Sequence, residues 1–235
     1  MRCADGSFAT APEDKASALH AAFFPAQRTQ VELKQPEDPA PRPERSFPNF
    51  TREEMDTALA DTSNSSAPGA SGFGYQLIKW LVDADGPRLL SLLTACTQLG
   101  HHPHAWREAV FVIIPKPGKK DKAAPKSFRP IALLEALSKL LEKMVNNRVQ
   151  HDASALGLLP SNQYGCRQKS STLDAALELV HDVDAAWSRG YVATTLTFDI
   201  SGFFDRVNHA RLCAVLSRMG FARCLVRWLR SWLDG

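Results

Sequence analysis

The spacing of apolar residues changes along the chain, and each spacing predicts a different element. A helical pattern occurs over residues 11–25, 75–84, 86–100, 135–150, 172–190, 208–220 and 223–235. Thr51 predicts the start of a further helix, because its hydroxyl can cap the first turn and Glu54 has the capping-box spacing. The helix at 135–150 is amphipathic, with one apolar face formed by Leu137, Leu140, Leu141, Met144 and Val145.

Two short apolar runs interrupt the helical pattern and predict buried strands. "AVFVIIP" (residues 109–115) is rich in β-branched residues and ends at a proline. "VATTLTFDI" (192–200) is a similar run that carries Asp199 near its end. Because the helices come in runs and the strands are few and separated, the expected fold class is α+β.

Charge and proline divide the chain into unlike parts. Residues 1–66 hold seven Lys/Arg against eleven Asp/Glu, and "KQPEDPAPRPERSFP" (34–48) predicts an extended linker. Residues 106–130 and 206–235 each carry an excess of five positive charges. Two basic segments are typical of a protein with a polyanionic partner, although solvated surfaces explain the charge equally well.

Cysteine spacing and hydropathy argue against several classes of protein. The five cysteines lie far apart and form no C-x-x-C pair, which disfavours a zinc site or a disulfide framework and favours reduced thiols. No apolar run reaches the length of about eighteen residues that a membrane span needs, and the first twenty residues lack a signal-peptide core. We expect an intracellular protein, in the nucleus or the cytoplasm, without a membrane partner.

Asp199 is the first candidate for chemistry. A carboxylate at the end of a buried strand is held rigidly and faces open space, which suits a divalent-metal ligand. Local pattern alone nevertheless favours the simpler interpretation that Asp199 ends the strand and caps the next turn.

The basic loop after residue 115 makes the interpretation of Asp199 as a metal ligand stronger. Lys116 follows the predicted strand directly, and Arg129 lies in "SFRPI" after a turn rich in Pro and Lys, which includes Lys119 and Lys120. A guanidinium that binds oxygens bidentately and a mobile ammonium together suit a triphosphate. A solvated, lysine-rich hairpin loop is the alternative.

Three further clusters are weaker signals. "NQYGCRQKSST" (162–172) mixes Gln163, Arg167 and Lys169 with an aromatic residue, as in segments that grip a nucleic-acid backbone. "HHPH" (101–104) has no accompanying acid or cysteine cluster, so we expect an exposed loop between helices. Trp228 and Trp232 have helical spacing. This spacing favours core positions over a platform on which bases stack.

Four blocks in a fixed order give a more specific signal. They are "APGASGFGYQLIKW", "VIIPKPGKK" with "KSFRPIALLEALSKLLEKMVNNRV", "NQYGCRQKSSTLDAAL" and "LTFDISGFFDRVNHARL". Together they resemble the reverse transcriptases of non-LTR (LINE-type) retrotransposons over residues 47–235, and the "GFFD" and "APGASG" variants look most like elements of fungi. The resemblance implies a right-hand polymerase, with fingers at 47–190 and the start of a palm at 191–235. Residues 1–46 look like the segment that joins such a polymerase to an upstream endonuclease.

The resemblance also assigns roles to single residues. Asp199 matches the first metal-binding, catalytic aspartate of the palm, with the backbone carbonyl of Ile200 as a further ligand for Mg²⁺ (or Mn²⁺). Phe204 matches the aromatic gate against ribonucleotides, and Lys116 and Arg129 match residues that hold the incoming dNTP. The template contacts fall on Lys119, Lys120, Gln163, Arg167 and Lys169. The implied partners are an RNA template, a DNA primer or target, and dNTPs.

The chain departs from the family pattern in two places. Ser71 stands in "APGASG" where many relatives have Asp, and Phe203 where many polymerases have a small residue. After Asp205 the chain holds one acid, Asp234, so the Y/F-x-D-D pair and the P-Q-G block of the family are missing. We therefore expect a chain truncated after the first palm motif, without the rest of the polymerase and the endonuclease, and inactive alone. The alternative is a non-catalytic, nucleic-acid-binding remnant of a retroelement.

Overall fold

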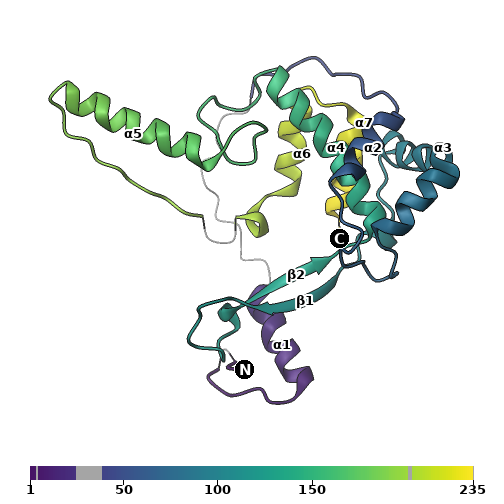
Figure 1. The fold of residues 1–235 in the computed structure, drawn as a ribbon, viewed down its shortest axis with the longest axis horizontal. Coiled ribbons are helices and arrows are strands. Elements are labelled where there is room, and N and C mark those ends of the chain that lie inside the picture. Colours follow the sequence, from purple (N-terminus) through teal and green to yellow (C-terminus); the bar gives the residue numbers. More distant parts are fainter. Residues whose placement is uncertain (4, 25–38, 201–202, 235) are drawn as a thin grey trace.

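Helices form most of the molecule, and a small sheet projects from them (Figure 1). The computed structural model describes residues 1–3, 5–24, 39–200 and 203–234. The helices are α1 (Pro12–Phe23), α2 (Arg52–Ala60), α3 (Tyr75–Leu99), α4 (Ala136–Ala155), α5 (Thr172–Ser188), α6 (His209–Arg218) and α7 (Arg223–Leu233). The strands are β1 (Val110–Pro115) and β2 (Phe128–Leu133), and the short 3-10 turns are η1 (His104–Trp106), η2 (Pro125–Ser127) and η3 (Phe204–Arg206). Each helix predicted from the sequence is therefore present.

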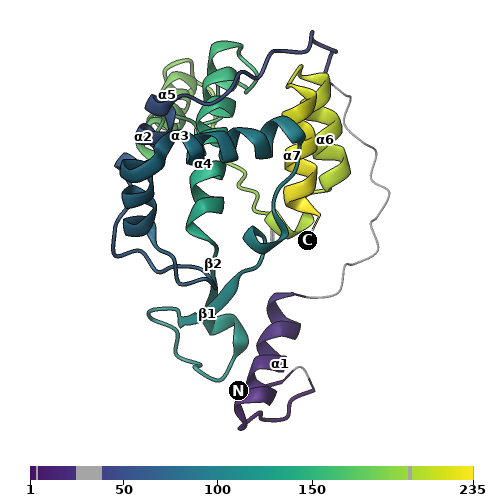
Figure 2. The same ribbon diagram turned by 90° about the vertical axis from the view of Figure 1, so that its right-hand side faces the viewer.

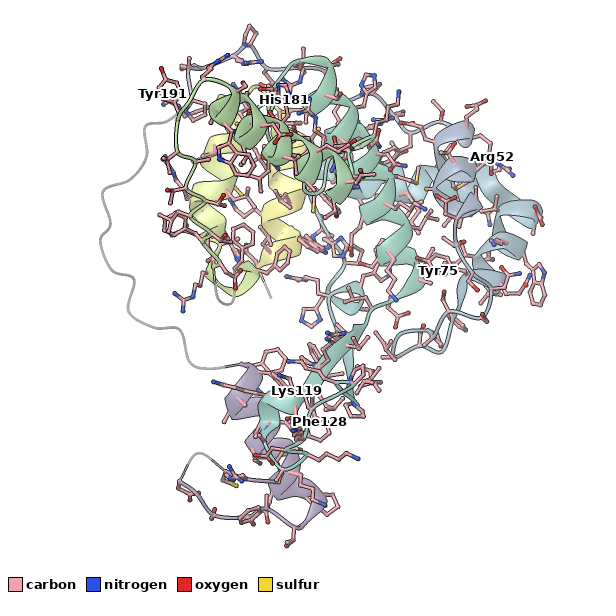
Figure 3. The ribbon with its side chains drawn as sticks, turned by 60° about the vertical axis from the view of Figure 1, so that its left-hand side comes forward. Arg52, Tyr75, Lys119, Phe128, His181 and Tyr191 are labelled. Carbon is pink, nitrogen blue, oxygen red and sulfur yellow. The ribbon has the colours of Figure 1, made fainter. Side chains whose placement is uncertain are left out.

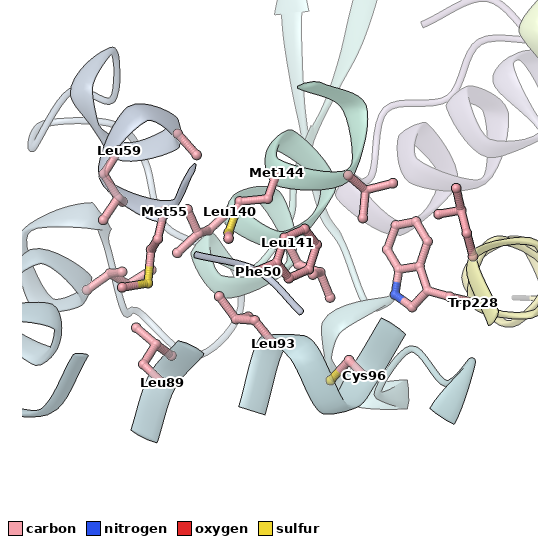
Figure 4. Close-up of a cluster of buried hydrophobic side chains, with 14 of the residues drawn as sticks. Phe50, Met55, Leu59, Leu89, Leu93, Cys96, Leu140, Leu141, Met144 and Trp228 are labelled. Atoms are coloured by element: carbon pink, nitrogen blue, oxygen red, sulfur yellow. The ribbon is translucent and has the colours of Figure 1, made fainter. Parts of the chain in front are cut away.

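The hydrophobic core lies where α2, α3, α4 and α7 meet (Figure 4). The predicted apolar face of α4 is confirmed, since Leu140, Leu141, Met144 and Val145 are buried and Leu137 packs against them. Trp228 of α7 is buried as well, which confirms its expected core position. Helix packing on the face of α4 thus fixes the helix that directly follows the β1–β2 hairpin.

Local signals in the sequence account for the ends of α2 and the shape of α3. The capping box of α2 is formed: the Glu54 N–H donates to Thr51 Oγ1 at 3.3 Å, and the Thr51 N–H donates to Glu54 Oε2 at 2.8 Å. The two helices expected over 75–100 are confirmed: both lie within α3 and meet at a kink at Asp85, whose backbone is not helical (φ −153°, ψ 57°). Pro87 explains the kink, because it has no N–H for the helix and its ring crowds the preceding turn.

Residues 39–50, here called the strap, are extended as the proline content predicts, but they are fastened to the helices. The Arg42 N–H donates to the Arg218 carbonyl at 2.8 Å, and the Arg45 N–H donates to the Gly220 carbonyl at 2.9 Å. The Arg45 guanidinium also bonds to Asp152 at 3.1 Å. The part of the expected linker at 25–38 lies outside the described residues.

The prediction of a buried strand at 109–115 is right about the strand and wrong about its burial. β1 pairs antiparallel with β2, which was not predicted, with Val110 opposite Leu133 and Pro115 opposite Phe128. Val112 and Ile114 are 41% and 47% exposed. The reason is that two strands make a single layer: α1 lies near this hairpin, and among the described elements none covers the face with Val112 and Ile114.

The strand predicted over 192–200 does not form. Residues 191–200 have no regular secondary structure, and Val192 and Phe198 are 92% and 82% exposed. A strand needs a neighbour for its backbone hydrogen bonds, and none of the described segments pairs with this one. α5, which precedes it, projects from the molecule (Figure 1) and buries none of its residues.

The expectation of an exposed "HHPH" loop is wrong for its second histidine. His102 is fully buried, and its Nε2 lies 3.1 Å from the Ser138 hydroxyl oxygen of α4. Its ring meets Trp106 and Trp228 edge to face, which explains why an aromatic side chain is accommodated there. None of the described helices combines the length and apolar character that a membrane crossing requires.

Candidate functional site

The hairpin β1–β2 brings together the two cations expected to hold a triphosphate. Arg129 lies in β2 opposite Ile114, and Lys116 directly follows β1. The Lys116 N–H donates to the Ser127 carbonyl at 2.8 Å, which extends the strand pairing by one residue. Because side chains alternate along a strand, Lys116 and Arg129 belong to the same face of the hairpin. Such diagonal neighbours lie about 7–8 Å apart, within the span of a triphosphate.

The two cations differ in how firmly they are held. Lys116 is half-buried, and its Nζ donates to the Lys126 carbonyl at 2.9 Å. Arg129 is exposed, and no described residue bonds to its guanidinium. Lys119 and Lys120 are exposed in the turn that Gly118 makes with a φ of +74°. The hairpin therefore presents one fixed ammonium and several free cations.

The loop between α4 and α5 holds the second group of predicted residues. The Arg167 guanidinium donates to the carbonyls of Pro160 and Ser161 at 3.1 and 3.2 Å, so it closes its own loop. Gln163 makes a weak internal contact of 3.4 Å to the Gly165 carbonyl. Lys169 is exposed and has a φ of +59°, a backbone conformation that a lysine adopts at a cost. Of these residues, Lys169 has the side chain most available to a nucleic acid.

The third group lies in the segment before α6. Asp199 and Ile200 are exposed and belong to the irregular run 191–200. Phe204 begins η3, is 83% exposed, and meets the Phe203 ring at a centroid distance of 5.4 Å. The predicted rigid strand end is thus absent, and Asp199 lies on an unpaired, solvated backbone.

Among the described residues, no hydrogen bond, ion pair or ring contact joins one of the three groups to another. Figure 3 shows Lys119 and Phe128 in the hairpin and, well away from them, Tyr191, where the irregular run 191–200 begins. Among the described residues, no group of three His, Cys, Asp or Glu side chains could hold a metal ion. Asp199 and the Ile200 carbonyl offer two ligand groups, whereas Mg²⁺ takes about six ligands in an octahedral arrangement. The described residues therefore do not form a complete metal site.

Sequence reasoning missed Glu135, which is the acid best ordered by the structure near the hairpin. It is 9% exposed, lies between β2 and α4, and accepts two hydrogen bonds from Ser71. Its position between the end of an apolar run and the start of a helix was the available signal, since acids are favoured at helix N-termini.

The comparison with known proteins decides the family. The sequence pattern described as "Reverse transcriptase (RNA-dependent DNA polymerase)" matches residues 114–234, just over half of the chain. The chain belongs to the reverse transcriptase family. The match begins near the end of β1 and includes β2, α4, the loop before α5 and the segment with Asp199. All three groups of predicted site residues therefore lie within the reverse transcriptase region.

Three relatives from Drosophila melanogaster extend this result. The "Probable RNA-directed DNA polymerase from transposon BS" is 27% identical over the whole chain, which covers 26% of that protein. The "Putative 115 kDa protein in type-1 retrotransposable element R1DM" is 31% identical over 94% of the chain and 20% of its own length. The "RNA-directed DNA polymerase from mobile element jockey" is 28% identical over 78% of the chain and 20% of its length.

These relatives define how far the likeness extends. The chain is similar to the polymerases of non-LTR retrotransposons, as the four sequence blocks predicted, and it spans about a quarter or less of these relatives. The finer resemblance to fungal elements gains no support from these insect relatives. Polymerases of this general kind work with divalent metal ions.

Proposed function

We propose that this chain is the nucleotide-binding part of an RNA-directed DNA polymerase of a non-LTR retrotransposon. In the proposed reaction a DNA 3′ end is extended with dNTPs on an RNA template. The single observation that carries the proposal is the family match over 114–234, which contains Lys116, Arg129, Asp199 and Phe204. Because an RNA template and dNTPs are intracellular molecules, the proposed site of action is inside a cell.

The proposed architecture follows the right hand of the family. Residues 47–190, with the hairpin, would form the fingers, and residues 191–235 the start of the palm. Residues 1–46 would join the polymerase to an upstream segment. The projecting hairpin supports this division, because an element that meets a nucleotide and a template from outside needs an exposed face.

Each group of residues has a proposed role in this reaction. Arg129 and Lys116 neutralise the triphosphate of the dNTP, and Lys119, Lys120, Gln163, Arg167 and Lys169 contact the template. Asp199 contributes one carboxylate, and Ile200 its carbonyl, to the binding of Mg²⁺ (or Mn²⁺). Phe204, whose exposed ring is free to meet a sugar, excludes ribonucleotides.

The binding of a fluorescent dNTP in the presence of Mg²⁺ tests the central claim. Lys116→Ala and Arg129→Ala should each weaken binding by about tenfold or more, since each removes a charge-assisted contact to phosphate. Arg88→Ala removes an equally positive but remote side chain, 87% exposed on α3, and should leave the affinity unchanged. Equal affinities in all four proteins would contradict the proposal.

A non-catalytic, nucleic-acid-binding remnant is the second candidate. It is favoured by one observation, the exposure of Asp199 on a backbone without regular structure. Such a remnant would bind RNA through its basic segments without any measurable affinity for dNTPs. Titration with dATP and Mg²⁺, with Lys116→Ala as the control, separates the candidates, because nucleotide binding that depends on Lys116 occurs only in the first.

A further inference from the structure

The attachment of the hairpin to the helices depends on a small number of residues. The hairpin projects from the molecule, and its second strand passes into α4 through Leu134 and Glu135 alone (Figure 2). The loop between α2 and α3 descends to this junction in the same view. At the other strand, Arg107 lies just before β1 and donates to the Ser231 carbonyl of α7 at 3.1 Å. The angle between the hairpin and the helices is therefore set at two places, and the contact of the loop with Glu135 is the one at the β2 end.

The loop and Glu135 are joined by two hydrogen bonds. The Ser71 N–H donates to Glu135 Oε1 at 2.8 Å, and the Ser71 hydroxyl donates to Glu135 Oε2 at 2.5 Å. Both carboxylate oxygens are thus used by one residue, in a side chain only 9% exposed. Hydrogen bonds to an ionised carboxylate are about twice as strong as those between neutral groups.

A tight backbone contact adjoins these hydrogen bonds. A methyl group on Gly69 would lie 2.7 Å from the Glu135 nitrogen and 2.8 Å from the Leu134 carbonyl carbon. No side chain larger than hydrogen fits there, so the loop backbone rests directly on the junction. The turn is braced internally as well, because the Gly72 N–H donates to the Gly69 carbonyl at 3.1 Å.

We propose that Gly69, Ser71 and Glu135 form a clamp that fixes the angle of the β1–β2 hairpin, and that Glu135 is thereby a positioning residue for nucleotide binding. The clamp acts on Lys116 and Arg129 through the hairpin and touches no substrate. This inference rests on the proposed role of those two cations in holding a dNTP. It assigns a purpose to a buried acid that lies outside the predicted nucleotide site.

The geometry of the clamp can be measured without any activity. Spin labels at Lys122→Cys in the hairpin and Asp83→Cys in α3 report their separation by double electron–electron resonance, after Cys3, Cys166 and Cys224 are changed to Ser. The native chain should give one narrow distance distribution. Glu135→Ala and Gly69→Ala should broaden it at least about twofold, because a local contact is released while the core remains folded.

Two matched variants separate the clamp from general damage. Glu135→Gln should restore the narrow distribution, because its amide oxygen accepts the Ser71 N–H and its amide group donates to the Ser71 hydroxyl oxygen. Gly74→Ala adds a methyl group in the same loop, where the backbone is extended and the nearest other atom is 3.9 Å away. It should leave the distribution unchanged.

Binding of dATP with Mg²⁺ to the unlabelled variants completes the test. The proposal expects Glu135→Ala to weaken binding by about three- to tenfold, with affinity restored in Glu135→Gln. A native distance distribution in Glu135→Ala overturns the clamp. A broadened distribution with native affinity overturns the positioning role if Lys116→Ala weakens binding, and overturns the proposed function itself if Lys116→Ala does not.

Discussion

Arg148 and Glu54 bind each other through two parallel hydrogen bonds that join α4 to the first turn of α2. The guanidinium donates from Nε to Oε1 at 2.5 Å and from Nη2 to Oε2 at 2.7 Å. It also donates to the Pro48 carbonyl at 2.6 Å and lies over the Phe50 ring at 4.3 Å. The hydrogen bond from Arg148 lowers the pKa of Glu54, so the pair is ionised at neutral pH. One side chain therefore fastens the strap, α2 and α4 together.

Loss of this guanidinium should destabilise the fold. Arg148→Ala leaves Glu54 half-buried and unpaired, and we expect a loss of about 2–3 kcal/mol in the free energy of unfolding. Arg148→Lys should recover less than half of this, since an ammonium cannot form the bidentate pair. Urea unfolding monitored by circular dichroism measures both. Arg88→Ala, in an exposed pair with Asp85, is the control and should cost less than about 0.5 kcal/mol; equal losses at positions 88 and 148 would contradict the assignment.

The buried His102 makes stability depend on pH. Burial, aided by the nearby Arg107 charge, lowers the pKa of His102 to about 4, from its usual 6.5. The unfolded chain therefore binds a proton more readily than the folded chain, and stability falls as the pH drops from 6.5 toward 4. The full loss is on the order of 3 kcal/mol. Urea unfolding measures the free energy of unfolding between pH 7 and 4. In His102→Gln this free energy should decline less with falling pH than in the native chain. His101→Gln, at an exposed position, should keep the native dependence on pH.

The strap should be sensitive to a single added methyl group. Gly220 has a φ of +83°, and a Cβ there would lie 2.3 Å from the Pro43 carbonyl oxygen. Gly118 has a similar φ of +74° but nothing within 4 Å, so its substitution reports the backbone cost alone. We expect Gly118→Ala to cost about 1–2 kcal/mol, and Gly220→Ala to cost clearly more because the strap must move. Thermal unfolding compares the stabilities of Gly118→Ala and Gly220→Ala. Limited proteolysis should cut the strap faster in Gly220→Ala. Similar results for both variants would contradict the docking of the strap on the helices.

RNA binding should weaken steeply with salt if the hairpin cations contact phosphates. Lys119 and Lys120 are exposed, so Lys119→Ala and Lys120→Ala should each reduce the slope of log K against log salt by about 0.7 for single-stranded RNA. Arg167→Ala removes a charge and also opens its own loop, so it should change affinity more than slope. Fluorescence anisotropy at several salt concentrations measures the slope. Lys15→Ala removes an exposed charge on α1 and is the control, which should keep the native slope. A flat slope of log K against log salt in the native chain would contradict the template role of the hairpin.

The sequence by itself determined the helices, the N-terminal cap of α2 and the family. The face of α4, the capping box at Thr51 and the order of four motif blocks are local properties of the chain, and all of them can be recognised before folding. The same blocks identified Lys116, Arg129 and Asp199 as candidates, because the family pattern is a pattern of residue types at fixed spacing.

Only the tertiary structure decided which of these residues meet and which elements become buried. The apolar run at 192–200 has the composition of a strand, yet strand formation depends on a partner that composition does not supply. His102 looks like part of a solvated loop, yet the packing of α3, α4 and α7 encloses it. The contact of Glu135 with Ser71 joins residues 64 positions apart, and periodicity contains no information on such distances. Helix formation and capping depend on residues that are near in sequence. Burial and long-range contacts depend on how whole helices pack against one another.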